Sequence, residues 1–108
     1  MTTPHPLRKR LHASCGDGWL PLLEDCLSQL EAFGYPVEGR IREKMGVLQI
    51  AIPAPSHLSP DDQRRWEDII RLAEETSMKV CEICAAPGRL RRSSRGNWAT
   101  RCTQHEET

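Results

Sequence analysis

The sequence predicts an α+β fold, in which a helix, a β-hairpin and a second helix form the core and a treble-clef-like zinc hairpin follows at the C-terminus. Apolar side chains recur at helical spacing in residues 17–33 and 59–78. Between these two segments, apolar and polar residues alternate on either side of Gly46, as is typical of a β-hairpin. Two short pairs of metal-binding residues come last, and they predict the zinc hairpin.

One core with two flanking parts is expected. A chain of 108 residues can bury roughly two-thirds of its surface, which supports a single modest core. Residues 1–16 hold two prolines and the basic run Arg8-Lys9-Arg10, so we expect a loosely ordered arm. Residues 17–78 are predicted to form the core, and residues 79–108 a zinc-binding module that packs on it.

The first helix is expected to begin at Asp17, a favourable N-cap residue, and to end before Gly34 and Pro36. Its apolar positions fall on one face, so Cys26 is interpreted as a core thiol. The residues of this face are Trp19, Leu22, Leu23, Cys26, Leu27, Leu30 and Phe33.

The hairpin is predicted from two runs of alternating residues. Its first strand is expected to begin at Val37, and its turn to lie in residues 43–46. Gly46 can adopt the positive φ that a tight turn needs. Pro53 and Pro55 end the second strand because proline cannot donate to a ladder. The apolar positions are Val37, Ile41, Leu48, Ile50 and Ile52.

The second helix has a clear start signal. Ser59 is a good N-cap, Pro60 suits the first helical position, and Asp62 is an early acid. The helix is expected to end near Met78. Its apolar face consists of Trp66, Ile69, Ile70, Ala73 and Ser77.

Two pairs with two intervening residues each, Cys81/Cys84 and Cys102/His105, predict one zinc site. This spacing lets both side chains of a pair reach one cation, and the 17 residues between the pairs suffice for a hairpin with its tip at residues 94–97. Four protein ligands close the tetrahedral shell of Zn²⁺, so the metal is expected to be structural. His12 and Cys15 have ligand-like spacing too, and a second metal site there stays an alternative.

The chain also resembles a group of small uncharacterised phage and prophage proteins. The matching segments are spread from Gly16 to His105 and read GDGWLPLLEDCLSQLE, IREKMGVLQI, LAEETSMKVCEIC followed by APG, and NWATRCTQH. The group typically has glycine after the second cysteine, where this chain has Ala85, and often has aromatic residues where this chain has residues 49–51. The resemblance implies a phage-related origin and the same zinc module, but no biochemical activity.

Charge is segregated although the formal net charge is zero. From Lys79 to Arg101 there are six basic residues against one acid, Glu82. Arginines neutralise phosphates and an aromatic ring stacks on unpaired bases, so this hairpin is one candidate surface for DNA or RNA. We expect Trp98 to pack against the zinc knuckle or the helices rather than to be exposed. The candidate binding residues are Arg89, Arg91, Arg92, Arg95 and Trp98.

The preferred hypothesis is a non-enzymatic protein that binds a host protein or complex through this hairpin or through the second helix. That helix carries an acidic strip, which could mimic nucleic acid, but arginines interspersed along it favour an ordinary solvated surface. The strip consists of Asp61, Asp62, Glu67, Asp68, Glu74 and Glu75.

Catalysis, export and membrane insertion are not expected. His5, His12 and His57 lie on predicted loops without an acidic partner at useful spacing, and there is no phosphate-binding glycine loop. No apolar run approaches the roughly 18 residues of a membrane span, and the start does not read as a signal peptide. Five cysteines without an export signal are typical of the reducing cytoplasm, here of a bacterial host.

Overall fold

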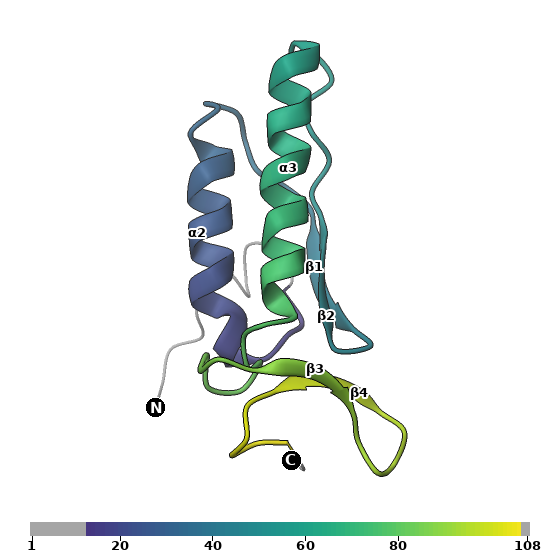
Figure 1. Ribbon diagram of the computed structural model, residues 1–108. Coiled ribbons are helices and arrows are strands. Elements are labelled where there is room, and N and C mark those ends of the chain that lie inside the picture. Colours follow the sequence, from purple (N-terminus) through teal and green to yellow (C-terminus); the bar gives the residue numbers. More distant parts are fainter. Residues whose placement is uncertain (1–12, 107–108) are drawn as a thin grey trace.

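The computed structural model describes residues 13–106, which form two α-helices and two antiparallel hairpins (Figure 1). This arrangement confirms the predicted α+β fold class and its order of helix, hairpin, helix and second hairpin. The elements are the 3-10 turn η1 (Asp17–Trp19), α2 (Leu20–Glu31), β1 (Arg40–Lys44), β2 (Val47–Ala51), α3 (Pro60–Ser77), β3 (Arg89–Arg92) and β4 (Trp98–Arg101).

The first helix starts later than the sequence predicts. Asp17 is the first residue of η1 instead of a helix N-cap, and α2 begins at Leu20, with Pro21 in its first turn. A distant segment holds this 3-10 turn, because the backbone of Gly18 lies against Cys81 and Glu82. The helix ends at Glu31, and Gly34 follows with a φ of 86°.

The second helix agrees with its sequence signals. The Ser59 side chain accepts a hydrogen bond from the Asp62 amide (3.1 Å), and Met78 is the C-cap. Trp66, Ala73 and Ser77 are buried along one face. Because both ends of α3 are specified locally, its boundaries were predictable.

The β1–β2 hairpin closes with a two-residue turn. Met45 (φ 53°) and Gly46 (φ 80°) both adopt positive φ, which is the conformation of a type I′ turn. The first strand begins at Arg40 rather than Val37. Arg40 pairs with Ala51, so an earlier start would place the chain opposite Pro53, which has no N–H to donate.

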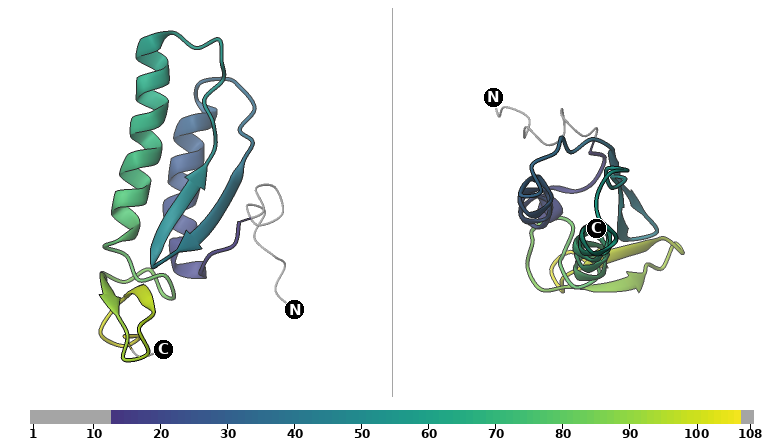
Figure 2. Two further views of the ribbon diagram at one scale, coloured as in Figure 1. Left: turned by 90° about the vertical axis from the view of Figure 1, so that its right-hand side faces the viewer. Right: turned by 90° about the horizontal axis from the view of Figure 1, so that it is seen from above.

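Helix α3 packs against both α2 and β2 (Figures 1 and 2). Side chains of α3 accept hydrogen bonds from the outer edge of β2. The amide of Leu48 donates to Ser77 Oγ (3.0 Å), and the amide of Ile50 donates to Glu74 Oε2 (2.9 Å). The apolar core lies among these elements and consists of Ala13, Trp19, Leu23, Cys26, Leu27, Leu30, Val37, Ile41, Leu48, Ile50, Ile52, Trp66 and Ala73.

Residues 13–16, which we expected to belong to a loosely ordered arm, are part of the fold. Ser14 lies beside β1: its amide donates to the Ile41 carbonyl and its carbonyl accepts from the Glu43 amide (both 2.9 Å). Ala13 is buried in the core. No sequence pattern indicates this contact, because a single bridge has no periodicity. Residues 1–12 and 107–108 lie outside the described part of the chain.

Candidate metal centre

The first ligand pair lies on a tight knuckle that directly follows α3. Val80 bridges to Pro87, and the Cys81 amide donates to the Ala86 carbonyl (2.8 Å). The Ala85 amide donates back to the Cys81 carbonyl (2.9 Å). Closing this turn requires Ala85 to adopt a φ of 68°, the left-handed conformation that glycine tolerates best.

The second pair follows β4 without a break. Cys102 comes directly after the strand, and the His105 amide donates to the Cys102 carbonyl (3.1 Å), which turns the imidazole back toward the knuckle. Residues 103–106 form a turn, so the terminal helix start expected for a treble clef does not occur within the described residues.

The four ligand atoms converge on one point. All of them lie within 4.8 Å of one another. Cys84 Sγ is 3.7 Å from Cys102 Sγ, and His105 Nδ1 is 3.2 Å from Cys102 Sγ and 3.8 Å from Cys81 Sγ. Metal–ligand distances of about 2.3 Å for sulfur and about 2.0 Å for nitrogen place tetrahedral ligand atoms about 3.5–3.8 Å apart. The cluster of Cys81, Cys84, Cys102 and His105 can therefore hold one tetrahedral metal ion.

The local backbone favours the thiolate form that a metal needs. Burial of Cys81 disfavours its charged form, but hydrogen-bond donors around the sulfur outweigh burial and lower the pKa of Cys81 to about 6; they are the backbone N–H groups of Cys84, Cys102 and Ile83. Cys81 and Cys102 are buried, whereas Cys84 is exposed. Solvent therefore reaches the cluster mainly at the Cys84 side chain.

The knuckle is attached to the core through η1. The Trp19 indole donates to the Val80 carbonyl (2.9 Å), and the Gly18 amide donates to the Glu82 carbonyl (2.8 Å). A Cβ on Gly18 would overlap the Cys81 carbonyl oxygen. Sequence reasoning missed this contact, although the motif GDGW with its two glycines was visible as a signal of close backbone approach.

A nearly buried ion pair braces the knuckle against β4. Arg101 Nη2 lies 2.8 Å from Glu82 Oε1, with both side chains largely shielded from solvent. Burial raises the pKa of Glu82, while the Arg101 charge opposes that rise. In the sequence, Glu82 stands out only as the single acid among the basic residues. No sequence pattern identifies Arg101 as its partner.

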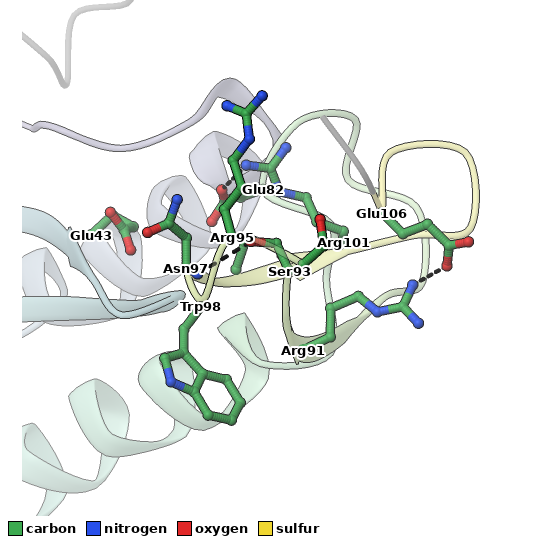
Figure 3. A pocket seen from close by; sticks show the side chains of 11 residues that line it. Glu43, Glu82, Arg91, Ser93, Arg95, Asn97, Trp98, Arg101 and Glu106 are labelled. Atoms are coloured by element: carbon green, nitrogen blue, oxygen red, sulfur yellow. Dashed lines mark hydrogen bonds and ion pairs between the residues drawn. The ribbon is translucent and has the colours of Figure 1, made fainter.

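One face of the β3–β4 hairpin bounds a polar pocket of about 420 Å³ (Figure 3). Glu43 of β1 lies at one end, and the ion pair of Arg91 with Glu106 lies at the other. Carboxylates and guanidinium groups alternate around the pocket, so it carries no uniform charge. Its remaining lining includes Glu82, Ser93, Ser94, Arg95, Asn97, Ala99 and Arg101.

The candidate arginines do not converge on one face. Cross-strand partners share a face, so Arg89 and Arg91 lie with Arg101, whereas Arg92 lies with Trp98 on the opposite face. Arg91 is paired with Glu106. Within residues 13–106, Arg89, Arg92 and Arg95 have no carboxylate partner.

Trp98 is more exposed than expected. Its side chain is 41% accessible, and its ring points away from the pocket (Figure 3). The prediction that Trp98 packs against the knuckle or the helices is therefore wrong. Its neighbour Thr100 takes the buried position on that face, where its hydroxyl donates to the Gly46 carbonyl (2.7 Å).

Several acids of the strip on α3 pair with arginines of the same helix, as on an ordinary solvated helix surface. Arg65 pairs with Asp62, and Arg71 pairs with both Asp68 and Glu75. Glu74 is engaged with the edge of β2. This internal pairing agrees with the interpretation that the strip is not a nucleic-acid mimic.

The other cysteines and histidines add no second cluster within the described chain. Cys26 is buried, and burial raises the pKa of its thiol to about 11, as expected for a core thiol. Cys15 packs against the core, but His12 lies outside the described residues, so the alternative site stays a prediction. His57 lies against the ring of Tyr35, with ring centroids 4.5 Å apart.

Comparison with protein-family models, curated proteins and solved structures gives no match to this chain. None of the helices in residues 13–106 has both the length and the apolar character needed to cross a membrane.

Proposed function

We propose that the bound metal is a single structural Zn²⁺. The donor set of three thiolates and one imidazole suits Zn²⁺, and four protein ligands leave no position for a substrate or an activated water. Zinc binding would hold the knuckle and the base of β3–β4 together and so stabilise the C-terminal part of the fold.

On this scaffold, the protein acts as a non-enzymatic binding protein that engages a host protein or complex through the β3–β4 hairpin. The observation that carries this proposal is Trp98, a large aromatic side chain that the zinc-held hairpin leaves 41% exposed. Exposed tryptophan with neighbouring arginine is typical of the residues that dominate protein interfaces. Arg92 lies directly across the hairpin from Trp98, and Arg95 lies at the tip.

A phage or prophage origin is part of this proposal, as is the cytoplasm of the bacterial host as its location. Both rest on the resemblance that runs from Gly16 to His105 and on the use of cysteine for metal binding. A gene placed among phage genes would support the origin, and a gene in a conserved cellular operon would contradict it.

The binding proposal is tested by capturing partners from host extract with zinc-loaded wild-type protein, Trp98→Ala and Leu72→Ala. Leu72 is a matched control, since its apolar side chain is also exposed but lies on α3. We expect one specific host protein that Leu72→Ala retains and Trp98→Ala loses by at least about tenfold, which corresponds to a hot spot of about 1.4 kcal/mol. A capture profile insensitive to Trp98→Ala would reject the hairpin as the binding surface.

Nucleic acid is the second candidate partner. Arg92 and Arg95 have no carboxylate partner among residues 13–106, and Trp98 is free to stack on an unpaired base. This alternative requires binding of a single-stranded oligonucleotide that weakens steeply as salt rises. Binding of that kind, together with no specific host protein, would replace the first proposal by the second.

A further inference from the structure

The outer edge of β3 has backbone groups that no neighbouring strand uses. The Ser93 amide donates to the Asn97 carbonyl (2.8 Å), which fixes the alternation of the β3–β4 ladder. Hydrogen-bonded pairs recur every second residue, so Arg91 and Arg89 bond to β4. The N–H and C=O groups of Leu90 and Arg92 therefore point away from β4.

Each of the other strand edges receives hydrogen bonds from elsewhere in the described chain. Ser14 bonds to the outer edge of β1, and side chains of α3 accept the outward N–H groups of β2. The Glu82 amide donates to the outward carbonyl of Thr100 on β4 (3.1 Å). Among residues 13–106, the outward N–H and C=O groups of Leu90 and Arg92 on β3 have no such partner.

The position of β3 leaves this edge accessible. Seen from above, β4 lies between β3 and the first hairpin, and β3 forms the outer boundary of the molecule (Figure 2). The hairpin is held on one side: the Leu90 side chain and the Ala99 backbone lie against the turn at Gly46, where a Cβ would come within 2.6–2.8 Å of them. An incoming strand would therefore meet a rigid edge, which lowers the entropic cost of binding.

Charge on this edge selects the kind of segment that fits. Arg89 and Arg92 lie on opposite faces of β3, and neither has a carboxylate partner within the described chain. A strand added about 4.8 Å away places its side chains beside both faces of β3. Acidic side chains would pair with these arginines, whereas basic ones would be repelled.

We propose that β3 binds an extended acidic segment of a partner protein, which adds a third strand to the β3–β4 sheet. This inference rests on the proposed function, since it assumes that the partner is a protein. Main-chain hydrogen bonds to Leu90 and Arg92 supply the attachment, and the flanking arginines select acidic sequence. Trp98, on the same face as Arg92, provides an adjoining apolar contact.

Amide hydrogen exchange of the zinc-loaded full chain tests the edge directly. In the free protein, the amides of Leu90 and Arg92 should exchange fast, whereas those of Arg91 and Ala99 should be protected by the ladder. A capped hexapeptide of alternating glutamate and valine is the probe; its glutamates all fall on one face of the added strand, where they can lie beside Arg92. It should slow exchange at Leu90 and Arg92 by about tenfold or more.

Two matched peptides separate backbone pairing from charge. The same hexapeptide with N-methylated backbone amides keeps its charge but cannot pair, and the lysine–valine peptide keeps the pairing groups but reverses the charge. We expect neither to protect Leu90 or Arg92. Arg92→Glu should abolish protection by the glutamate peptide, whereas Arg64→Glu on exposed α3 should leave it unchanged.

The edge inference is overturned if the Leu90 and Arg92 amides are already protected in the free protein, if the glutamate peptide leaves them unprotected, or if the N-methylated peptide binds equally well. Failure of the proposed function looks different. A host protein that depends on Trp98 but leaves these amides fast would retain the binding proposal and reject strand addition. Binding of nucleic acid alone would reject both.

Discussion

At Ala85 the knuckle places an ordinary residue in a conformation that favours glycine. Its φ of 68° follows from the tight turn that brings Cys84 back toward Cys81. The left-handed region costs a residue with a Cβ about 1–2 kcal/mol. Glycine at this position would adopt the same conformation without that cost.

Ala85→Gly is therefore expected to stabilise the protein by about 1 kcal/mol, because relief of strain exceeds the extra entropy of an unfolded glycine. Urea unfolding of the zinc-loaded protein measures it. Ala86→Gly is the matched control: Ala86 does not have positive φ, so this change should cost about 0.5–1 kcal/mol. Equal effects of the two substitutions would mean that strain at Ala85 is negligible.

The identity of the metal-site residues was predictable, whereas much of what surrounds them was not. Cys81, Cys84, Cys102 and His105 are recognisable because ligand chemistry requires fixed local spacing. The Glu82–Arg101 ion pair and the exposure of Trp98 depend on which face of the hairpin meets the turn at Gly46. That contact joins residues about 50 positions apart, and no local pattern encodes it.

At the level of elements, the β1–β2 hairpin depends on α3 for its outer edge. Ser77 Oγ accepts the buried amide of Leu48, and Ser77 itself donates to the Glu74 carbonyl (2.6 Å). The helix thus serves as a substitute third strand for a two-stranded sheet, which would be marginal alone. Apolar periodicity placed Ser77 correctly on the buried face of α3 but could not reveal this hydrogen bond.

Ser77→Ala should destabilise the protein by about 1–3 kcal/mol, since it leaves the Leu48 amide buried without an acceptor. Thr76→Ala removes a hydroxyl that bonds only to the Leu72 carbonyl of the same helix, and it should change stability by less than about 0.5 kcal/mol. Thermal unfolding of both variants compares them. A loss from Thr76→Ala as large as that from Ser77→Ala would argue against edge capping.

The elements themselves were largely predictable, because helix caps, prolines and the turn at Gly46 act locally. The predicted boundaries of elements are wrong where a segment distant in sequence contacts the element. The knuckle displaces the start of α2 by holding η1, and Ser14 joins β1 although it lies in a stretch without periodicity. Both differences arise from tertiary contacts.

In the whole molecule, the metal module and the core share one interface. Gly18 and Trp19 join η1 to the knuckle through hydrogen bonds to Glu82 and Val80. Trp19 is at the same time fully buried in the core. Metal binding at the knuckle should therefore influence the core, beyond the C-terminal module alone.

Gly18→Ala tests this interface. The added Cβ would overlap the backbone of Cys81, so we expect a loss of about 3 kcal/mol together with weaker metal retention. Gly34→Ala introduces the same methyl group into open space at a φ of 86°, so it should cost only about 1 kcal/mol and leave metal retention unchanged. Similar metal retention in both variants would show that the contact between η1 and the knuckle does not affect metal binding.

Chelation of the metal should change the hydrogen exchange of the Trp19 indole N–H. The carbonyl that accepts its indole N–H belongs to Val80, next to ligand Cys81, so removal of metal should accelerate exchange of that N–H. The NMR signal of the Trp19 indole measures this. An unchanged signal after chelation, with the second hairpin unfolded, would show that the module melts independently of the core.

The metal stoichiometry of purified, tag-free protein tests the central claim most directly. Native mass spectrometry should find one Zn²⁺ in each wild-type and Cys15→Ser chain, and none in Cys84→Ser, because only the latter loses a ligand of the cluster. Wild-type protein without stoichiometric metal, or Cys84→Ser that retains its zinc with an unchanged melting curve, would contradict the assignment.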